Sequence, residues 1–257
     1  MNLQFLAKRN PHLRDAHITF DEGPHIYTID GDSSFTSSTT WVHKHFGHFD
    51  ADVIITKMMS SKRWPQSKYY SKTRQDIKDE WEKNRDEAAT AGTKMHYDIE
   101  CFYNNNVIIN DSDEYNYFKT FESDYSHLKP YRTEWEVFDK ELKIAGSIDM
   151  TYEDEDGNIV IYDWKRSKEI KKENRYQSSI TPGLEHLPDT NFWHYSLQLN
   201  IYKYLLEKNY GKKVVGMFLV CLHPNNKNHS YIRLEVNHLK DEMDTIIRHR
   251  KVEINIV

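Results

Sequence analysis

The sequence predicts an α/β protein in which helices flank a mixed β-sheet and a largely helical portion comes first. Three observations support this fold class. Helical patterns dominate residues 38–127, strand patterns take over from residue 131, and a long helical pattern separates the first three strands from the last two. Tight turns join antiparallel strands, whereas a helical crossover joins parallel ones, so this order predicts a mixed sheet.

The N-terminal portion begins with a short strand pair and continues as helices. The strands are expected at residues 17–21 and 25–30, and the second meets the turn signal Asp30-Gly31. Residues that can cap a helix precede the helical patterns. The expected helices run from Ser38 or Thr39 to Phe46, over residues 51–60 after Asp50, over residues 73–104 with an interruption at Ala91-Gly92, and from Asp111 or Ser112 to about His127.

From Tyr131 the hydrophobic period becomes that of strands. The expected elements are strands at 131–139, 142–153 and 158–164, a helix at 191–208, strands at 213–223 and 230–236, and a last helix at 238–251. Two parts are therefore expected. An N-terminal hairpin and helical region covers residues 1–90, and an α/β core covers residues 91–257.

The composition limits the classes of function. A chain of 257 residues and 30.8 kDa can bury a large core. Its 35 basic residues against 40 acidic ones give a net charge of −5, so any nucleic-acid contact must come from a local basic patch. Two cysteines, Cys101 and Cys221, cannot supply a disulfide framework or an iron–sulfur cluster. Because no secretory or membrane-spanning pattern is present, a soluble intracellular protein is expected.

The strongest functional signal is Asp163-Trp164-Lys165, at the end of an apolar strand. An acid, any residue and a lysine recur elsewhere in the chain, so the triplet alone is weak. Side chains alternate along a strand, so Asp163 and Lys165 share one face while Trp164 points into the opposite layer. Asp149 ends, or nearly ends, the neighbouring strand, and a reversal can bring the two carboxylates together. The alternative is an ordinary ion pair at a strand end.

Two carboxylates beside a lysine suit a hard cation such as Mg²⁺ or Mn²⁺. Such a group fits the hydrolysis of a phosphodiester, whose negative charge repels an attacking hydroxide. A divalent ion offsets that charge, acidifies a bound water and steadies the departing oxyanion. The lysine can position or deprotonate the water, or stabilise the charge that grows on the phosphate.

Two helical pairs add to this signal. His96 and Glu100 are four residues apart, as are Gln198 and Tyr202, so each pair shares one helix face. Neutral imidazole is a metal ligand, and Glu100 can hold it or reach the same ion. Gln198 and Tyr202 can grip a phosphate or orient Lys165. Either pair alone is better explained as an ordinary helix surface, and only the ordered set of motifs favours a site.

A further carboxylate is available on the strand at residues 131–139. Alternation places Glu134 and Glu136 on one face, next to the strand that carries Asp149. One of them, with Glu136 as the candidate, can be an outer ligand of a second metal site. The alternative is a solvated strand face.

The ordered set of His96, Glu100, Gly146, Asp149, Asp163, Lys165, Gln198 and Tyr202 resembles the RecB-like branch of the PD-(D/E)XK nuclease superfamily. That branch includes phage lambda-type exonucleases and CRISPR-associated RecB-like nucleases, and similar genes occur in giant DNA viruses. The resemblance covers roughly residues 91–208 and implies a restriction-endonuclease-like core. It implies metal ligation by His96, Asp149, Asp163 and the backbone carbonyl of Trp164, a catalytic Lys165, and a supporting role for Gln198 and Tyr202. Many CRISPR-associated members hold an iron–sulfur cluster, which is not expected here.

Two basic stretches are candidates for DNA contact. Residues 62–74 hold five cations and no acid, interleaved with aromatic residues. Cations meet phosphates and aromatic faces stack on bases, which suits a single strand or a frayed end. The second stretch, residues 165–175, follows the strand that carries Lys165. The alternative interpretation of both stretches is a solvated loop. The predicted contacts are Arg63, Lys68, Tyr69, Tyr70, Lys72, Arg74, Arg166 and Lys168.

The sequence thus predicts a metal-dependent deoxyribonuclease, an exonuclease that uses Mg²⁺ or Mn²⁺ and water. Residues 91–257 are the expected nuclease core, and residues 1–90 the portion that guides DNA. The alternatives are a structure-selective or nonspecific endonuclease, and an inactive DNA-binding module that partners a helicase. Single-stranded DNA or duplex ends are the expected substrates. The sequence does not decide whether the protein forms a homo-oligomer, and no membrane partner is expected. A viral member would act in DNA repair or recombination in the cytoplasm or nucleus of its host.

Overall fold

The computed structural model describes residues 3–255 and divides the chain into two compact units. The larger unit runs up to residue 47 and again from residue 95, and the smaller one comprises residues 48–94. Within the described residues, no helix is long and apolar enough to span a lipid bilayer. The functional division predicted between residues 90 and 91 stays a prediction.

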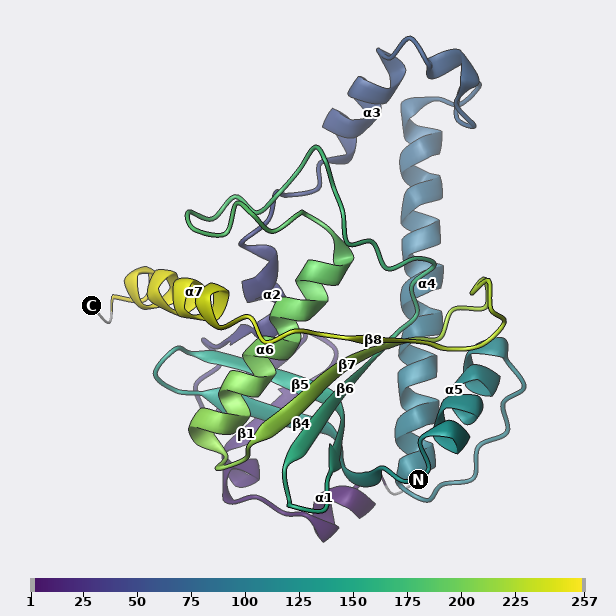
Figure 1. Cartoon of the computed structure of the whole chain (residues 1–257). Helices are drawn as coiled ribbons and strands as arrows, with labels where there is room; N and C mark the ends of the chain where they lie inside the picture. The colour runs from purple at the N-terminus through teal and green to yellow at the C-terminus, as the bar shows by residue number, and fades with distance from the viewer. Residues whose placement is uncertain (1–2, 256–257) are drawn as a thin grey trace. The chain divides into compact units, whose positions relative to one another are not determined.

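A six-stranded mixed sheet forms the centre of the larger unit (Figure 1). β4, β5 and β6 are antiparallel neighbours, β6 and β7 are parallel, and β8 pairs with β7 in the antiparallel sense. The short β3 lies parallel to the start of β5. The predicted α/β class and mixed sheet are confirmed. The strands are β3 (Thr36–Ser37), β4 (Lys129–Asp139), β5 (Ile144–Glu153), β6 (Ile159–Lys165), β7 (Val214–Cys221) and β8 (Ile232–Glu235).

Helices cover both faces of this sheet because β6 is apolar on both sides. Ile159 and Ile161 belong to one core cluster, which includes α6 (Asn191–Asn209), α2 (Ser38–His43) and the start of α7 (Lys240–Glu253). Trp164 belongs to the other cluster, with α5 (Asp113–Asp124) and the last turns of α4 (Arg74–Tyr103). Since α6 connects β6 to the parallel β7, it is the crossover that the sequence predicts.

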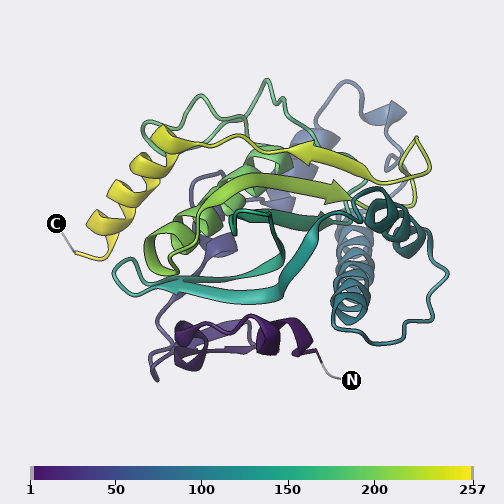
Figure 2. The same ribbon diagram turned by 60° about the horizontal axis from the view of Figure 1, so that its bottom comes forward.

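The N-terminal elements pack along β4 (Figure 2). The guanidinium of Arg132 on β4 lies 2.8 Å from the carboxylate of Asp15, and Asn10 donates to the carbonyl of Tyr131 at 2.7 Å. The elements are α1 (Phe5–Arg9), a 3₁₀ helix at Leu13–His17, and a two-stranded sheet of β1 (Ile18–Asp21) and β2 (Ile26–Ile29). They form an outer layer against β4.

Several local predictions differ from the structure. Helix α4 continues through Ala91-Gly92 without the expected interruption, because one glycine costs a helix only about 1 kcal/mol relative to alanine. Helix α5 ends at Asp124, short of His127, and Ser112 rather than Asp111 caps it. The short elements α1, the 3₁₀ helix and β3 were not predicted from the sequence, since none is long enough to show a hydrophobic period.

The smaller unit is a pair of helical segments with a small apolar centre. α3 (Ala51–Met59) begins after Asp50, whose carboxylate accepts a hydrogen bond from the amide of Val53 at 3.0 Å. A 3₁₀ turn at Trp64–Gln66 leads to the first turns of α4. Ile55 and Ile77 are fully buried.

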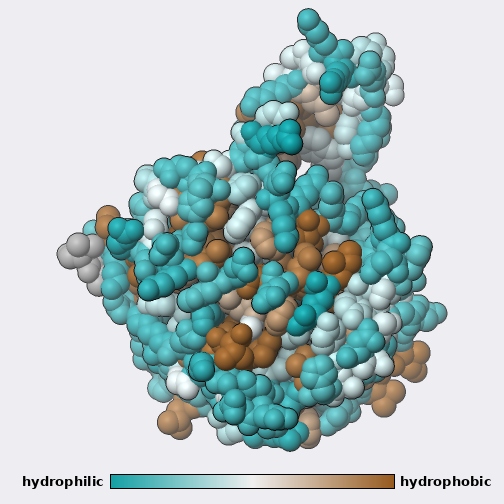
Figure 3. All heavy atoms as spheres, viewed as in Figure 1, coloured by the Kyte–Doolittle hydropathy of each residue, from teal (hydrophilic) through white to brown (hydrophobic). Residues whose placement is uncertain are grey.

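On the face of the larger unit seen in Figure 3, apolar side chains form patches among mainly hydrophilic ones. Strands β7 and β8 contribute exposed Val215 and Ile232 to the surface of this unit. Single exposed apolar residues such as Val215 and Ile232 are normal on protein surfaces and indicate no particular partner.

Gly146 on β5 permits a close approach of α2 and α6 to the sheet. A Cβ at this position would lie 2.7 Å from Oγ of Ser38 and 2.7 Å from a ring carbon of Tyr202. The Ser38 hydroxyl donates to the carbonyl of the preceding residue, Ala145, at 3.1 Å. Both neighbours are buried and tied down, so neither can move aside without cost.

We therefore expect Gly146→Ala to lower the free energy of unfolding by about 1–3 kcal/mol through overpacking. Gly47→Ala is the control, because nothing lies within 4 Å of its added Cβ. Urea denaturation followed by circular dichroism compares the two. Equal midpoints for both variants would show that the approach of α2 and α6 is not tight.

His45, just after α2, is buried with its imidazole uncharged. Its Nδ1 lies 2.8 Å from Oγ1 of Thr181, and Nε2 has no hydrogen-bond partner within the described chain. Burial, aided by the nearby His249, lowers the pKa of His45 to about 4. The unfolded chain thus takes up a proton near pH 6.5 that the folded chain refuses until about pH 4.

This histidine makes the folded state lose stability as the pH falls from about 6.5 to 4. At pH 5 its contribution to that loss is about 2 kcal/mol. We expect His45→Gln to lose correspondingly less stability than the wild type between pH 7.5 and pH 5, measured by denaturant titration. Parallel pH profiles of the two proteins would contradict a neutral, buried imidazole.

Candidate active site

The end of β6 carries a buried carboxylate beside an ammonium group. Asp163 is 1% exposed, and its Oδ2 lies 2.6 Å from Nζ of Lys165. The contact is an ion pair without the geometry of a directed hydrogen bond, and no other donor in the described chain reaches either oxygen of Asp163. Burial raises the pKa of Asp163 to about 6, against the opposing effect of Lys165.

The site opens where β5 and β6 separate. Their backbone ladder ends at the pair Met150 and Tyr162. Beyond it, the amide of Trp164 donates to Oδ2 of Asp149 at 2.9 Å, so a side chain replaces the backbone acceptor. Burial raises the pKa of Asp149 as well. The charge of Asp149 also adds to the raised pKa of Asp163, so the two carboxylates lie near each other at the end of β6.

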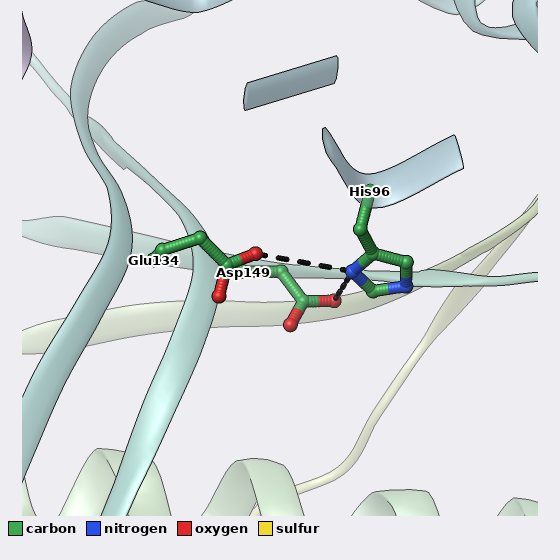
Figure 4. Close-up of side chains that lie close together, drawn as sticks. All are labelled: His96, Glu134 and Asp149. Carbon is green, nitrogen blue, oxygen red and sulfur yellow. Dashed lines mark ion pairs between the residues drawn. The ribbon is translucent and has the colours of Figure 1, made fainter. Parts of the chain in front are cut away.

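Figure 4 shows the carboxylates of Glu134 on β4 and Asp149 on β5 turned toward the imidazole of His96 on α4. Nδ1 of His96 lies 3.5 Å from Oδ2 of Asp149 and 3.9 Å from Oε1 of Glu134. One ligand atom of each residue lies within 4.8 Å of the other two. Although burial opposes the charge, Asp149 and Glu134 raise the pKa of His96 to about 9. A proton on His96 therefore partly balances these acids.

Glu134 reaches this group through its place on β4 and an unusual backbone. It lies opposite Asp149 in the ladder of β4 and β5, and its φ of 40° is rare for a residue with a side chain. The Ser147 hydroxyl donates to its Oε2 at 2.9 Å. Such strain costs about 1–3 kcal/mol and is found mainly at functional sites.

The structure places Glu134, and not Glu136, beside His96 and Asp149. Glu136 pairs with Ser147, two residues further along β4, and its carboxylate faces Asp15 and Arg132. We therefore propose Glu134 in place of Glu136 as the outer carboxylate, since alternation defines a face but not a position along the strand. Glu100, one turn after His96, lies outside the group of three, and burial raises its pKa to about 7.

Helix α6 presents a row of polar side chains to the same site. The Gln198 amide donates to the hydroxyl of Tyr202 at 2.9 Å and to Oγ1 of Thr39 at 3.2 Å. One turn before Gln198, the ring centroid of Tyr195 lies 4.5 Å from Nζ of Lys165. Tyr195 was missed from the sequence, although its spacing of three residues before Gln198 places it on the same helix face.

A family model described as the PD-(D/E)XK nuclease superfamily matches residues 112–254, more than half of the chain. The chain belongs to the PD-(D/E)XK nuclease superfamily. The predicted superfamily is thereby confirmed, and the chain is a metal-dependent nuclease, a hydrolase of phosphodiester bonds. A search among curated proteins finds no match. The RecB-like branch is compatible with these findings and stays a prediction.

The residues of the nuclease site fit a divalent cation on two observations. Carboxylate oxygens and an imidazole nitrogen converge from α4, β4 and β5, which is a donor set that Mg²⁺ and Mn²⁺ accept. In addition, Lys165 is the only donor beside the buried oxygens of Asp163 among the described residues. Buried carboxylates in native proteins are normally satisfied, so these acceptors are available to a ligand.

The residues predicted to contact DNA differ in their surroundings. Among the described residues, Arg63 is exposed without an ion pair, and so is Lys168. Lys68 and Lys72 both approach the carboxylate of Glu80. Four contacts are internal: Trp81 donates to the Tyr69 hydroxyl, Arg74 donates to Thr56, Arg166 pairs with Glu114, and Tyr70 lies 6.0 Å from Trp64 between ring centroids.

Proposed function

We propose that this nuclease is a deoxyribonuclease that depends on Mg²⁺ or Mn²⁺ and removes nucleotides from DNA ends. The observation that carries the proposal is the group of His96, Glu134 and Asp149 at the opening between β5 and β6, beside the buried Asp163 and its partner Lys165. The charge of Asp149 adds to burial in raising the pKa of Asp163, so two acids lie near each other next to an ammonium group, which matches the needs of phosphodiester hydrolysis.

His96, Asp149, Asp163 and the backbone carbonyl of Trp164 would hold the cation, with Glu134 as a further carboxylate. When bound, the cation offsets the charge of the phosphodiester and lowers the pKa of a coordinated water. Glu134 is tied to Ser147 and His96 faces it, so the ligands are held in place before binding. Such preorganisation lowers the cost of assembling the site.

Lys165 acts as a fixed positive charge in this proposal. Its Nζ contacts the Asp163 carboxylate and lies over the ring of Tyr195, and both neighbours stabilise an ammonium. The ammonium would stabilise the negative charge that grows on the phosphate. Gln198 links Tyr202 to Thr39 and thereby holds α6 and α2 together at the site.

Exonuclease action follows the resemblance to lambda-type enzymes, and an endonuclease shares the same core. Circular single-stranded DNA separates the two, because a molecule without ends is degraded only by internal cuts. Degradation of the circle at the rate of the linear form would favour the endonuclease. The inactive module that partners a helicase would bind DNA tightly and would not cleave it, whichever divalent metal is added.

The rate of DNA cleavage tests the roles of Asp163 and Lys165. Asp163→Asn and Lys165→Ala should each lower the rate of DNA cleavage by at least about 10²-fold, because the first removes a charged ligand of the cation and the second removes the ammonium that would stabilise the phosphate. Degradation of end-labelled DNA with and without Mn²⁺ measures the rate, and circular dichroism checks that the variants are folded. Full activity of Lys165→Ala, or activity in excess chelator, would contradict the proposal.

The same proposal distinguishes the two glutamates of β4. Glu134→Gln should weaken Mn²⁺ binding at least about tenfold in calorimetric titrations, because it removes a charged ligand. Glu136→Gln is the matched control, two residues along the same strand, and should bind Mn²⁺ like the wild type. A larger loss for Glu136→Gln would reverse the assignment of the outer carboxylate.

We also propose that the segment at residues 62–74 guides the DNA strand. Exposed Lys62, Arg63 and Tyr70 offer two cations and a ring to a single strand. Lys68 and Lys72 share the charge of Glu80, so they contribute less to phosphate binding. Tyr69 and Arg74 hold the segment in shape through Trp81 and Thr56.

The salt dependence of DNA binding gives a quantitative test of this role, because each phosphate contact releases counterions. Replacing Lys62 and Arg63 with alanine should weaken single-strand binding and flatten its salt dependence by about 0.7 in the log–log slope per lost contact. Replacing Lys68 and Lys72 should change the slope less. Fluorescence anisotropy in chelator, over a range of salt concentrations, measures both, and an unchanged slope in the first variant would exclude the role.

A further inference from the structure

The loop at residues 166–190, between β6 and α6, borders an open surface pocket that the proposed cleavage does not use. The loop runs over the N-terminal end of α6 (Figure 1). The pocket has a volume of about 650 Å³. The residues of interest in its lining are Asn174, Arg175, Tyr176, Thr190 and Asn191.

Side-chain amides hold this loop in one conformation. Oδ1 of Asn174 accepts from the amides of Tyr176 and Gln177 at 3.0 and 3.2 Å, and its Nδ2 donates to the carbonyl of Asp189 at 2.8 Å. Asn191, the first residue of α6, accepts from the amide of Lys171 and donates to the carbonyl of Glu169. The pocket is therefore formed in advance, which lowers the cost of binding.

This rigid loop exposes an aromatic ring and a cation to solvent. Tyr176 is 94% exposed, and Arg175 is exposed without an ion pair among the described residues. A ring held out by a fixed backbone is a surface on which a nucleobase can stack, and a guanidinium beside it can meet a phosphate.

The start of α6 adds a second, independent observation. Thr190 precedes the helix, is 8% exposed, and its hydroxyl has no hydrogen-bond partner within the described chain. This hydroxyl does not cap the helix from Asn191 to Asn209, whose positive end lies at the pocket with the Phe192 amide donating to the Lys171 carbonyl at 3.3 Å. A buried, unused hydroxyl at such an end suits a phosphate oxygen.

Three acids line the pocket beside Lys171 and Arg175. Asp189 lies 2.9 Å from His194 but keeps its charge, because burial lowers the pKa of that histidine, and Glu169 lies 3.6 Å from Lys171. The remaining acid, Glu173, is exposed, so salt screens its repulsion.

The pocket lies close to the proposed cleavage site. Its loop begins directly after Lys165, and Asn191 is four residues before Tyr195, whose ring contacts Lys165. Four residues of helix correspond to about 6 Å. A strand whose phosphate lies at Lys165 would therefore bring a neighbouring nucleotide to the pocket.

We propose that this pocket binds one unpaired nucleotide next to the phosphate that is cleaved. Tyr176 stacks on its base, while Arg175, Thr190 and the start of α6 hold its phosphate. The identity of the ligand as DNA rests on the proposed function. Stacking accepts any base but requires that it be unpaired, so the pocket selects single strands and not a sequence.

Binding of a fluorescein-labelled single-stranded DNA to the full chain, in chelator, tests the pocket by anisotropy. Tyr176→Ala and Arg175→Ala should each weaken binding about tenfold, whereas Tyr176→Phe, which keeps the ring, should bind like the wild type. Ile180→Ala is the matched control, because this residue of the same loop is 65% exposed and does not line the pocket. Binding of blunt duplex DNA should be unaffected by Tyr176→Ala.

Unchanged single-strand binding by Tyr176→Ala, or an equal loss in Ile180→Ala, would overturn the proposal. An equal loss on blunt duplex would also overturn it, since a paired base cannot stack on the ring. Because no metal is present, the result is independent of cleavage. A chain that shows the expected binding pattern but cleaves no DNA with Mg²⁺ or Mn²⁺ would refute the proposed function and leave the nucleotide pocket standing.

Discussion

The hydrogen bond from the Trp164 amide to the Asp149 carboxylate is the contact on which the site depends. It takes the place of a backbone pair beyond Met150 and Tyr162, so β5 and β6 separate there while β6 continues its parallel ladder with β7. The separation lets the acids of both strands face one space. Both acids are shielded from solvent there, and this burial raises the pKa of Asp149 and of Asp163 above the usual range. Buried acids are expensive unless a cation balances them, and Lys165 and protonated His96 balance them only in part.

The layers on either side of β6 position this opening. Trp164 anchors one face among the aromatic residues of α5, while Gly146 lets α2 and α6 approach the other face. Tyr195, Gln198 and Tyr202 then lie along one side of α6, from the ammonium of Lys165 to the first turn of α2. The same helix begins at the nucleotide pocket, so one rigid element aligns the proposed binding and cleavage positions. A shift of α6 would therefore disturb both together.

Much of this arrangement could be predicted from the sequence. Alternation along β6 separates Trp164 from Asp163 and Lys165, and helical spacing pairs Gln198 with Tyr202. Register could not be predicted in the same way: Glu134 and Glu136 are equivalent by alternation, and only the pairing of β4 with β5 and the backbone of Glu134 select the former. Likewise, the sequence shows no acidic partner for Lys68 and Lys72, because Glu80 approaches them only after the chain folds. Contacts between distant residues carry no local period, so they were missed.

The central claim is that the groups around this opening share one divalent cation. Crystals grown with Mn²⁺ test it most directly, through the anomalous scattering of the metal. The account predicts a peak within about 2.5 Å of an oxygen of Asp149 and of Asp163, with the imidazole of His96 as a further ligand. A peak that touches none of these side chains, or no peak at saturating Mn²⁺, would contradict it.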